Sequence, residues 1–395
     1  MKSLPALLAI LVCASLPLHA ASLADLTYTT NNGKVTITDC DEAATGELVI
    51  PNTIQGNPVV YIGEAAFERC VRLTRVTIPE GVTNIGPRGF LGNTLLEEIL
   101  LPQSLINIQE SAFRDCFNLR NLILPPNLFT ISARAFSNCY SLRKVIIPDS
   151  VISTGKSVFA VCLRLEEITF GNNLIWISDS TCSTCSNLKK VILGENIREI
   201  KAHAFQSCEK LAEISLPPSV TWIGDYAFEG ASNLRKVNIP DNVINIGSYA
   251  FNGCSLKRIV IPARVTNIGT YTFSNSYDLH SLIFLGPAPQ RFRPFQSMTI
   301  GTTVYIQSEH QDSFGGESGE WEGLPVKIGN GPSTPPVRIH FPTVEGATYR
   351  MQNSTDLVNW RNNPFPIVGG SKERYDRFVD PSSRAKIFYR LIRVD

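Results

Sequence analysis

The segment Pro102-Gln-Ser-Leu-Ile-Asn-Ile-Gln-Glu-Ser-Ala-Phe-Arg-Asp-Cys-Phe-Asn-Leu-Arg-Asn-Leu-Ile-Leu124 decides the fold, because Pro125 opens another copy of the same pattern. Copies follow one another every 23 residues, and only the last step is one residue shorter. A fixed period of this length is typical of a solenoid. One column of large apolar residues contains Phe67, Phe90, Phe113, Phe136, Phe159, Cys182, Phe205, Phe228, Phe251 and Phe273.

Each copy divides into three parts. The spacing Leu-x-x-Val-x-Ile, as in Leu73 to Ile78, ends in an apolar alternation that predicts a short strand. Proline or glycine follows, as at Pro79, and a strand ends at proline because proline cannot donate to the ladder. A second, shorter extended piece, Val-x-x-Ile-Gly, leads into Ala-Phe-x-x-Cys, which is long enough only for a single helical or 3₁₀ turn.

One such unit cannot bury its own apolar face, whereas stacked copies can. We expect equivalent strands to pair in parallel about 4.8 Å apart, so that ten rungs form a rod roughly 45–50 Å long. The phenylalanine column then forms the spine of the core. The predicted fold class is a β-rich leucine-rich-repeat solenoid, a parallel β ribbon with short helical or 3₁₀ turns, followed by a small antiparallel β domain.

The repeated phrase resembles the BspA-like, or treponemal, class of leucine-rich repeats. Its consensus is close to I-P-x-x-V-x-x-I-G-x-x-A-F-x-x-C-x-x-L-x-x-V-x, and the resemblance covers roughly residues 45–285. Members of that class are mostly secreted or surface-attached and are linked with adhesion to host or matrix molecules. The resemblance therefore implies the fold strongly and the function only in outline.

Composition and charge exclude several classes of protein. With 43% apolar residues the chain is globular rather than disordered. A net charge of +1 leaves no basic surplus to neutralise phosphates, which argues against a nucleic-acid partner. Lys2, the apolar run Leu4 to Leu18 and the small residues Ala20 and Ala21 predict a secretory leader. No other stretch reaches the ~20 apolar residues that a transmembrane helix needs.

Most of the ten cysteines occupy one column of the repeat, where Asn93, Ala231 and Ser276 replace cysteine in other copies. A position shared by these residue types requires a small side chain, and buried free cysteine meets that need. Parallel Cβ vectors on neighbouring rungs suit a disulfide poorly, so we favour a reduced ladder over disulfides. Cys182-x-x-Cys185 follows from the register and does not indicate a zinc site.

Two outward columns on the main strands form the candidate binding face. The first column alternates in charge, which cross-strand pairing favours. The second is apolar in its first half, and exposed apolar patches tend to mark interaction sites. High β-propensity, or cover from neighbouring lysine and arginine stems, would also account for it. The candidate residues are Arg75, Glu98, Lys144, Glu167 and Lys190 in the first column, and Thr77, Leu100, Ile123, Ile146, Thr169 and Ile192 in the second.

The sequence indicates no catalytic machinery. His203, His280, His310 and His340 are scattered over different contexts, and no metalloprotease, nucleophile-elbow or phosphate-binding motif occurs. We therefore expect a non-enzymatic chain without cofactor or metal.

Outside the repeats, residues 337–395 alternate in short runs that predict an antiparallel β module, similar to a C-terminal module of secreted bacterial proteins. We expect an exported recognition or adhesion protein that binds a protein or polysaccharide. A structural envelope scaffold and a targeting accessory to a separate enzyme stay open, as do the ligand, the anchoring mode and the oligomeric state. The predicted parts are a signal peptide (1–21), an N-terminal cap (22–49), the solenoid (50–285), a C-terminal cap (286–330), a linker (331–336) and the β module (337–395).

Overall fold

The computed structural model describes residues 20–289, 302–316, 319–322 and 324–329 in full, and His19 and six C-terminal strands by their backbone. The predicted leader up to residue 18 and the predicted linker lie outside the described residues. The chain forms two compact units. The described residues up to Leu279, with Pro289, belong to the first, and those of 280–288 and from 302 onward belong to the second.

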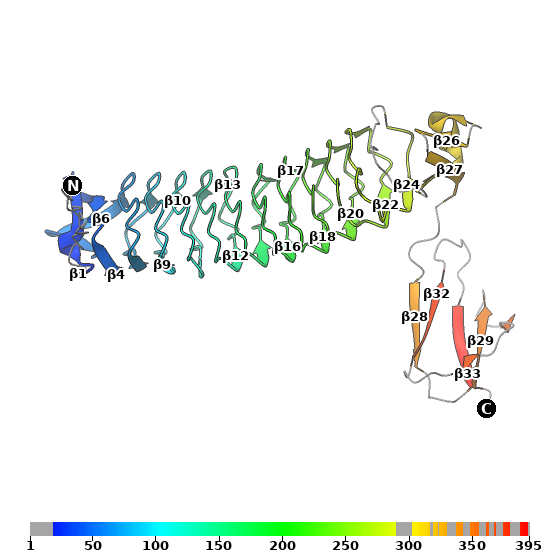
Figure 1. Ribbon diagram of the computed structural model, residues 1–395, viewed down its shortest axis with the longest axis horizontal. Coiled ribbons are helices and arrows are strands. Elements are labelled where there is room, and N and C mark those ends of the chain that lie inside the picture. The colour runs from blue at the N-terminus through cyan, green and yellow to red at the C-terminus, as the bar shows by residue number, and fades with distance from the viewer. Residues whose placement is uncertain are drawn as a thin grey trace, which may run out of the picture. The chain divides into compact units, whose positions relative to one another are not determined.

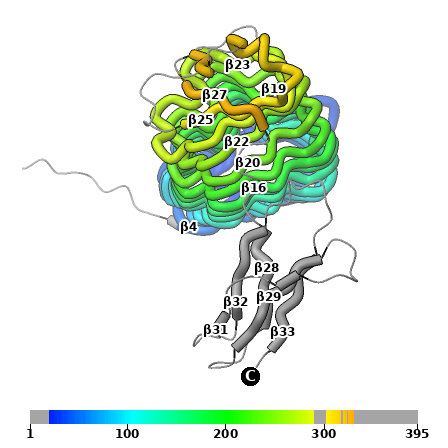
Figure 2. The backbone as a smooth tube through the Cα atoms, turned by 90° about the vertical axis from the view of Figure 1, so that its right-hand side faces the viewer, coloured from blue at the N-terminus to red at the C-terminus, as the bar shows by residue number. Residues whose placement is uncertain are grey.

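The first unit is the solenoid, a stack of coils that follow one another in chain order (Figures 1 and 2). The main strands of successive coils lie side by side and form one ribbon, called ribbon A below. Within each paired group the register is parallel, as in Lys144↔Glu167↔Lys190. The strands of ribbon A are β1 (His19–Ala20), β4 (Ala44–Val49), β7 (Leu73–Thr77), β9 (Glu98–Leu100), β12 (Lys144–Ile146), β14 (Glu167–Thr169), β16 (Lys190–Ile192), β18 (Glu213–Ser215), β20 (Lys236–Asn238) and β22 (Arg258–Ile261).

Ribbon B collects the shorter extended pieces on a second side of each coil. A β-hairpin at the N-terminal end, β2 (Leu26–Asn31) and β3 (Lys34–Cys40), follows the 3₁₀ turn η1 (Leu23–Asp25) and pairs through β3 with the first coil. The ribbon B strands are β6 (Asn57–Ile62), on which β5 (Thr53–Ile54) folds back, β8 (Asn84–Ile85), β10 (Asn107–Ile108), β11 (Thr130–Ile131), β13 (Ser153–Thr154), β15 (Trp176–Ile177), β17 (Glu199–Ile200), β19 (Trp222–Ile223), β21 (Asn245–Ile246) and β23 (Asn267–Ile268).

The Ala-Phe-x-x-Cys segment forms the third side, and it is more regular than the sequence predicts. Each coil makes turn bonds such as Cys70 N–H to Phe67 O, and three further N–H groups donate to the next coil, as from Ala65, Phe67 and Arg69. This ladder runs without interruption from the first coil to Ser274. It depends on two left-handed residues per coil, one before the alanine and one before the cysteine. Sequence reasoning did not anticipate them, because most are not glycine.

Val161 is poorly suited to its left-handed backbone, as is Thr184 in the next coil, since both have φ of 61° and β-branched side chains strongly disfavour this region. Asn138 and Asn275 occupy the equivalent position in other coils. We expect Val161→Asn to raise the free energy of unfolding by about 1 kcal/mol, because asparagine tolerates left-handed backbone. Urea denaturation followed by circular dichroism measures the change. A loss of stability would show instead that the packing of Val161 outweighs its backbone strain.

The predicted phenylalanine spine is present. All nine phenylalanines of the column are fully buried, and neighbouring rings stack nearly parallel, with centroids 4.7 Å apart for Phe67 and Phe90 and 5.2 Å apart for Phe113 and Phe136. Cys182 interrupts the file, and Phe170, directly after β14, is buried edge-on against Phe205, 6.4 Å between centroids. The other coils of ribbon A carry leucine or isoleucine at the position of Phe170, so this larger residue fills volume that Cys182 leaves.

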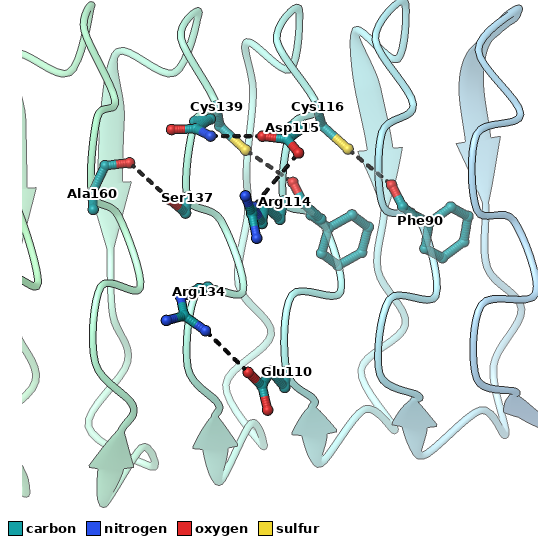
Figure 3. Close-up of polar contacts among 11 residues, drawn as sticks. Phe90, Glu110, Arg114, Asp115, Cys116, Arg134, Ser137, Cys139 and Ala160 are labelled. Atoms are coloured by element: carbon teal, nitrogen blue, oxygen red, sulfur yellow. Dashed lines mark hydrogen bonds and ion pairs between the residues drawn. The ribbon is translucent and has the colours of Figure 1, made fainter.

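The side chains of the cysteine column donate a hydrogen bond to a backbone carbonyl in every described coil except that of Ala231. Cys116 and Cys139 donate from Sγ to the carbonyls of Phe90 and Phe113, both at 3.2 Å (Figure 3). Asn93 Nδ2 and Ser276 Oγ donate to the equivalent carbonyls at 2.7 and 3.0 Å. Size alone was the sequence-based interpretation, and it missed this shared donor. The nine described cysteines are free, and burial raises the pKa of the Cys139 thiol.

Substitution of Cys139 separates the effect of side-chain size from the effect of the hydrogen-bond donor. We expect Cys139→Ala to lower the free energy of unfolding by about 1 kcal/mol, since the Phe113 carbonyl keeps only its backbone donor from Cys116. Cys139→Ser retains the donor and should be closer to wild type. The midpoints of urea denaturation of the two variants give the comparison. An alanine variant more stable than the serine variant would favour size over hydrogen bonding.

Ribbon A is interrupted, whereas the sequence predicts a continuous ribbon. Residues 119–124 form only the single bridge Glu98↔Asn121, and further breaks lie between β16 and β18 and between β20 and β22. The first two breaks adjoin the coils that carry Pro125-Pro126 and Pro217-Pro218. Two successive prolines remove two backbone donors and restrict the residue before each, which disfavours regular pairing there.

The second unit begins with β24 (Ser281–Phe284), which pairs in parallel with β25 (Thr303–Ile306), and β25 pairs with β27 (Leu324–Ile328). The 3₁₀ helix η2 (Ser308–Phe314) and β26 (Glu320–Trp321) enclose a cluster of Phe284, Phe314 and Trp321. The predicted C-terminal strands are present as two antiparallel groups. These contain β28 (Val337–Pro342) with β32 (Arg374–Val379), and β29 (Thr348–Ser354) with β30 (Arg361–Asn362), β31 (Ile367–Val368) and β33 (Phe388–Arg393).

Candidate functional site

The apolar column of ribbon A is exposed. Leu100, Ile146 and Ile192 are each more than two-fifths exposed, and Ile123 reaches 79%. Thr77 and Thr169 lie in the same column and are half-buried. Their outward direction follows from the strand alternation, since Val76, Ile99 and Ile168 point into the core. The column also begins one coil earlier than predicted, because Val49 pairs with Thr77 and is 69% exposed.

The charged column beside it forms ion pairs between neighbouring coils. Arg75 contacts Glu47 and Glu98 at 2.8 and 2.7 Å. Glu167 accepts from Lys190 at 2.8 Å and lies 3.2 Å from Lys144, and these hydrogen bonds, from Lys190 first, hold the pKa of Glu167 below its ordinary value. Exposed pairs of this kind contribute little to stability, so their main effect is to set the charge of the face.

Two hollows in the face lie at the first two breaks in ribbon A. At the first break, a groove of about 530 Å³ has Ile123 and Ile146 among its lining, together with Arg120, Arg143 and Lys144. At the second, a groove of about 650 Å³ is lined by Val191 to Leu193 and Ser215 to Ser219. Apolar side chains and charged groups therefore meet where the backbone ladder is interrupted. Five predicted face residues lie around these two grooves, namely Glu98, Ile123, Lys144, Ile146 and Ile192.

A second exposed apolar column lies on the other side of the proline turn, and sequence reasoning missed it. Ile106, Phe129, Ile152 and Ile175 occupy one position in four successive coils, and each is more than two-fifths exposed. The sequence contains the pattern that could have revealed this column. A large apolar residue recurs directly after the buried Val or Leu of the second extended piece. Neutral Asn107, Thr130 and Ser153 flank the column, so it lacks the charged rim of ribbon A.

The structure brings no catalytic group together within the part of the chain that it describes. No set of three or more His, Cys, Asp or Glu side chains there could hold a metal ion. His203 stacks on Tyr226, 4.7 Å between ring centroids, and its Nδ1 lies 3.1 Å from Gln206 Oε1. Tyr226 stacks in turn on Tyr249, so this histidine is one ring of a half-buried aromatic file on the turn side.

Comparison with known families identifies the repeat. The family model for the BspA type leucine rich repeat region matches residues 44–166 and 153–280, in six copies. The chain belongs to the BspA type leucine-rich-repeat family. This membership confirms the resemblance read from the repeated phrase, and the parallel coils confirm the predicted fold class.

Three solved structures of similar chains come from bacteria. A leucine-rich repeat protein from Bacteroides ovatus is 25% identical, with 77% of this chain and 75% of that chain covered and a TM-score of 0.58. The leucine rich repeat protein of T. pallidum is 30% identical over 49% of this chain and 91% of its own, with a TM-score of 0.45. A leucine rich cell surface protein from Faecalibacterium prausnitzii is 23% identical over 72% and 96%, with a TM-score of 0.41. A comparison with curated proteins finds no match.

Membership in the BspA type family indicates a role in protein interaction or at the cell surface, on a repeat scaffold not known for catalysis. Across the described residues, no helix combines the length and the apolar character that crossing a bilayer requires.

Proposed function

We propose that this chain is an exported, non-catalytic recognition or adhesion protein that binds a protein or glycan through ribbon A. The contact surface consists of the apolar column with its charged rim, and the solenoid holds these side chains at fixed spacing. The predicted division into leader, caps, solenoid, linker and β module belongs to this proposal. The leader would deliver the chain to the cell surface or the medium, with the periplasm as another destination.

The proposal depends mainly on the first break of ribbon A, where highly exposed apolar side chains line a groove. Ile123 is the most exposed large apolar side chain among the described residues, and it lines the same groove as Ile146. Exposing such side chains to water is unfavourable by roughly 25 cal/mol per Å², so a partner that covers them gains binding energy. Arg143 forms no ion pair within the described part of the chain and can meet an acidic group of that partner.

Two other roles stay open beside this one. A structural envelope component would space or assemble other molecules without a dedicated ligand. An accessory would carry a separate enzyme to its substrate. Both use a rigid rod, and neither requires the exposed apolar column, which is why recognition is preferred.

Binding of the full chain to arrays of matrix proteins, glycans and cell-envelope fractions tests the proposal. Saturable binding to a soluble protein or glycan supports recognition. Self-association, or binding to envelope fractions alone, would favour the scaffold role instead.

A further inference from the structure

The candidate face changes character along ribbon A. In the second column Ile192 is followed by Ser215 and Asn238 in the next two coils, and Val260 comes after them. Ser215 and Asn238 are exposed. These two coils thus present hydroxyl and amide groups that can hydrogen-bond to a polar ligand.

The balance of charge changes at the same place. Before this point the first outward column and the residue directly before it, as in Glu166 and Glu167, carry both signs in near-equal number. From Lys189 onward they carry cations against Glu213 alone. Lys189 and Lys190 are paired with Glu166 and Glu167 of the preceding coil, both at 2.8 Å. The cations of this half are Lys189, Lys190, Arg235, Lys236 and Lys257, with Arg258 beside them.

The later cations have little local compensation. Lys236 lies 3.9 Å from Glu213, and both side chains are more than 70% exposed, so the pair is weak. Arg235 and Lys257 are exposed, and neither forms an ion pair with any residue that the structure describes. Their positive charge therefore remains available to a ligand.

Three of the cations share a hollow. Lys189, Lys190 and Lys236 line a depression of about 490 Å³ together with Glu213, Ser215 and Asn238. Coils repeat about every 4.8 Å, so the cations form a row along the ribbon, interrupted only at the coil that carries Glu213.

We propose that this second half of ribbon A, called the basic half, binds an anionic polysaccharide, an extended glycan with carboxylate or sulfate groups. Lysine and arginine bind the acidic groups, and Ser215 and Asn238 hydrogen-bond to sugar hydroxyls. The proposal names one ligand class for the recognition face proposed above, and it rests on that face being a binding surface. It does not require the apolar half to bind anything.

A single-stranded nucleic acid is also an anionic polymer, but it fits the basic half less well than an anionic polysaccharide does. Such ligands bind through stacking of bases on aromatic side chains in a basic groove. No aromatic residue lines the depression among the described residues, which contribute Val191, Ile192 and Ile214 instead. The whole chain also has a net charge of only +1.

Binding of the full chain to immobilised polygalacturonate and dextran sulfate, with neutral dextran as a blank, tests the proposal. We expect retention on one or both acidic polymers that weakens as ionic strength rises from about 0.05 to 0.3 M. Arg235→Glu with Lys236→Glu should weaken retention about tenfold or more, since two attractive charges become repulsive. Binding by one acidic polymer alone identifies carboxylate or sulfate as the recognised group.

Lys156→Glu with Arg198→Glu is the matched control, because both cations are exposed and lie outside the strands of ribbon A. It should keep polysaccharide retention within about twofold of wild type if the basic half is the site. Equal losses in the two double variants would overturn the proposal in favour of diffuse charge. Retention on neither acidic polymer, or tighter binding of a single-stranded oligonucleotide, would also overturn it.

Discussion

Replacement of Leu100, Ile123 and Ile146 together by aspartate is expected to weaken binding of the partner of the apolar half by at least about a hundredfold. The three residues are exposed in the free protein, so their change removes contact area and places three carboxylates where the partner would have to desolvate them. The fold should persist, because none of the three contributes to the core, and the circular dichroism spectrum should match that of wild type.

The second apolar column supplies a control with the same number of aspartate substitutions. Ile106, Phe129 and Ile152 have similar exposure and lie on the opposite side of the proline turn in the same three coils. Their replacement by aspartate introduces the same charge on the same rod. Retained binding in the first triple variant, or equal loss in both, would exclude the apolar half of ribbon A as the contact surface.

Replacement of Phe113 by alanine is expected to lower the free energy of unfolding by about 3–5 kcal/mol. The ring is fully buried and stacks between Phe90 and Phe136, at 5.1 and 5.2 Å. Neighbouring coils hold this space fixed through the backbone ladder of the turn side, so the cavity cannot readily collapse. In a solenoid each coil contacts only its neighbours, so loss of a central ring also weakens the coupling between the two ends.

Urea denaturation measures the stability change, and hydrogen exchange locates it. Phe117 provides the comparison, because it lies in the same coil and stacks on Tyr140 at 4.7 Å but is only half-buried. Phe117→Ala should cost much less, near the roughly 0.5–1.5 kcal/mol that a ring pair adds beyond its burial. Similar costs for the two variants would mean that the phenylalanine file is not the main source of stability.

The fold was predictable because the same sequence pattern recurs in every coil. A single coil would leave the boundaries of its strand, turn and core position ambiguous, but the recurrence of the phrase places Phe67, Phe90 and Phe113 in one column without ambiguity. The outward direction of Leu100 and Ile123 followed from the same alternation. The second apolar column was missed although its residues recur at the same interval, because only the buried Val and Ile of that segment were considered.

The sequence alone therefore determined the solenoid, its period, its spine and the direction in which the candidate face points, since each depends on which residues recur at one position. Only the tertiary structure showed where ribbon A breaks and that the turn side contains two left-handed residues per coil. It also showed that Cys116 and Cys139 donate to the phenylalanine carbonyl of the preceding coil. These features arise from contacts between coils, where the backbone of one turn meets the side chains of the next, and no single copy of the repeat contains that pairing. The division of the face into an apolar and a basic half came from both, because the residues were visible in the sequence but their ion pairs and shared hollows were not.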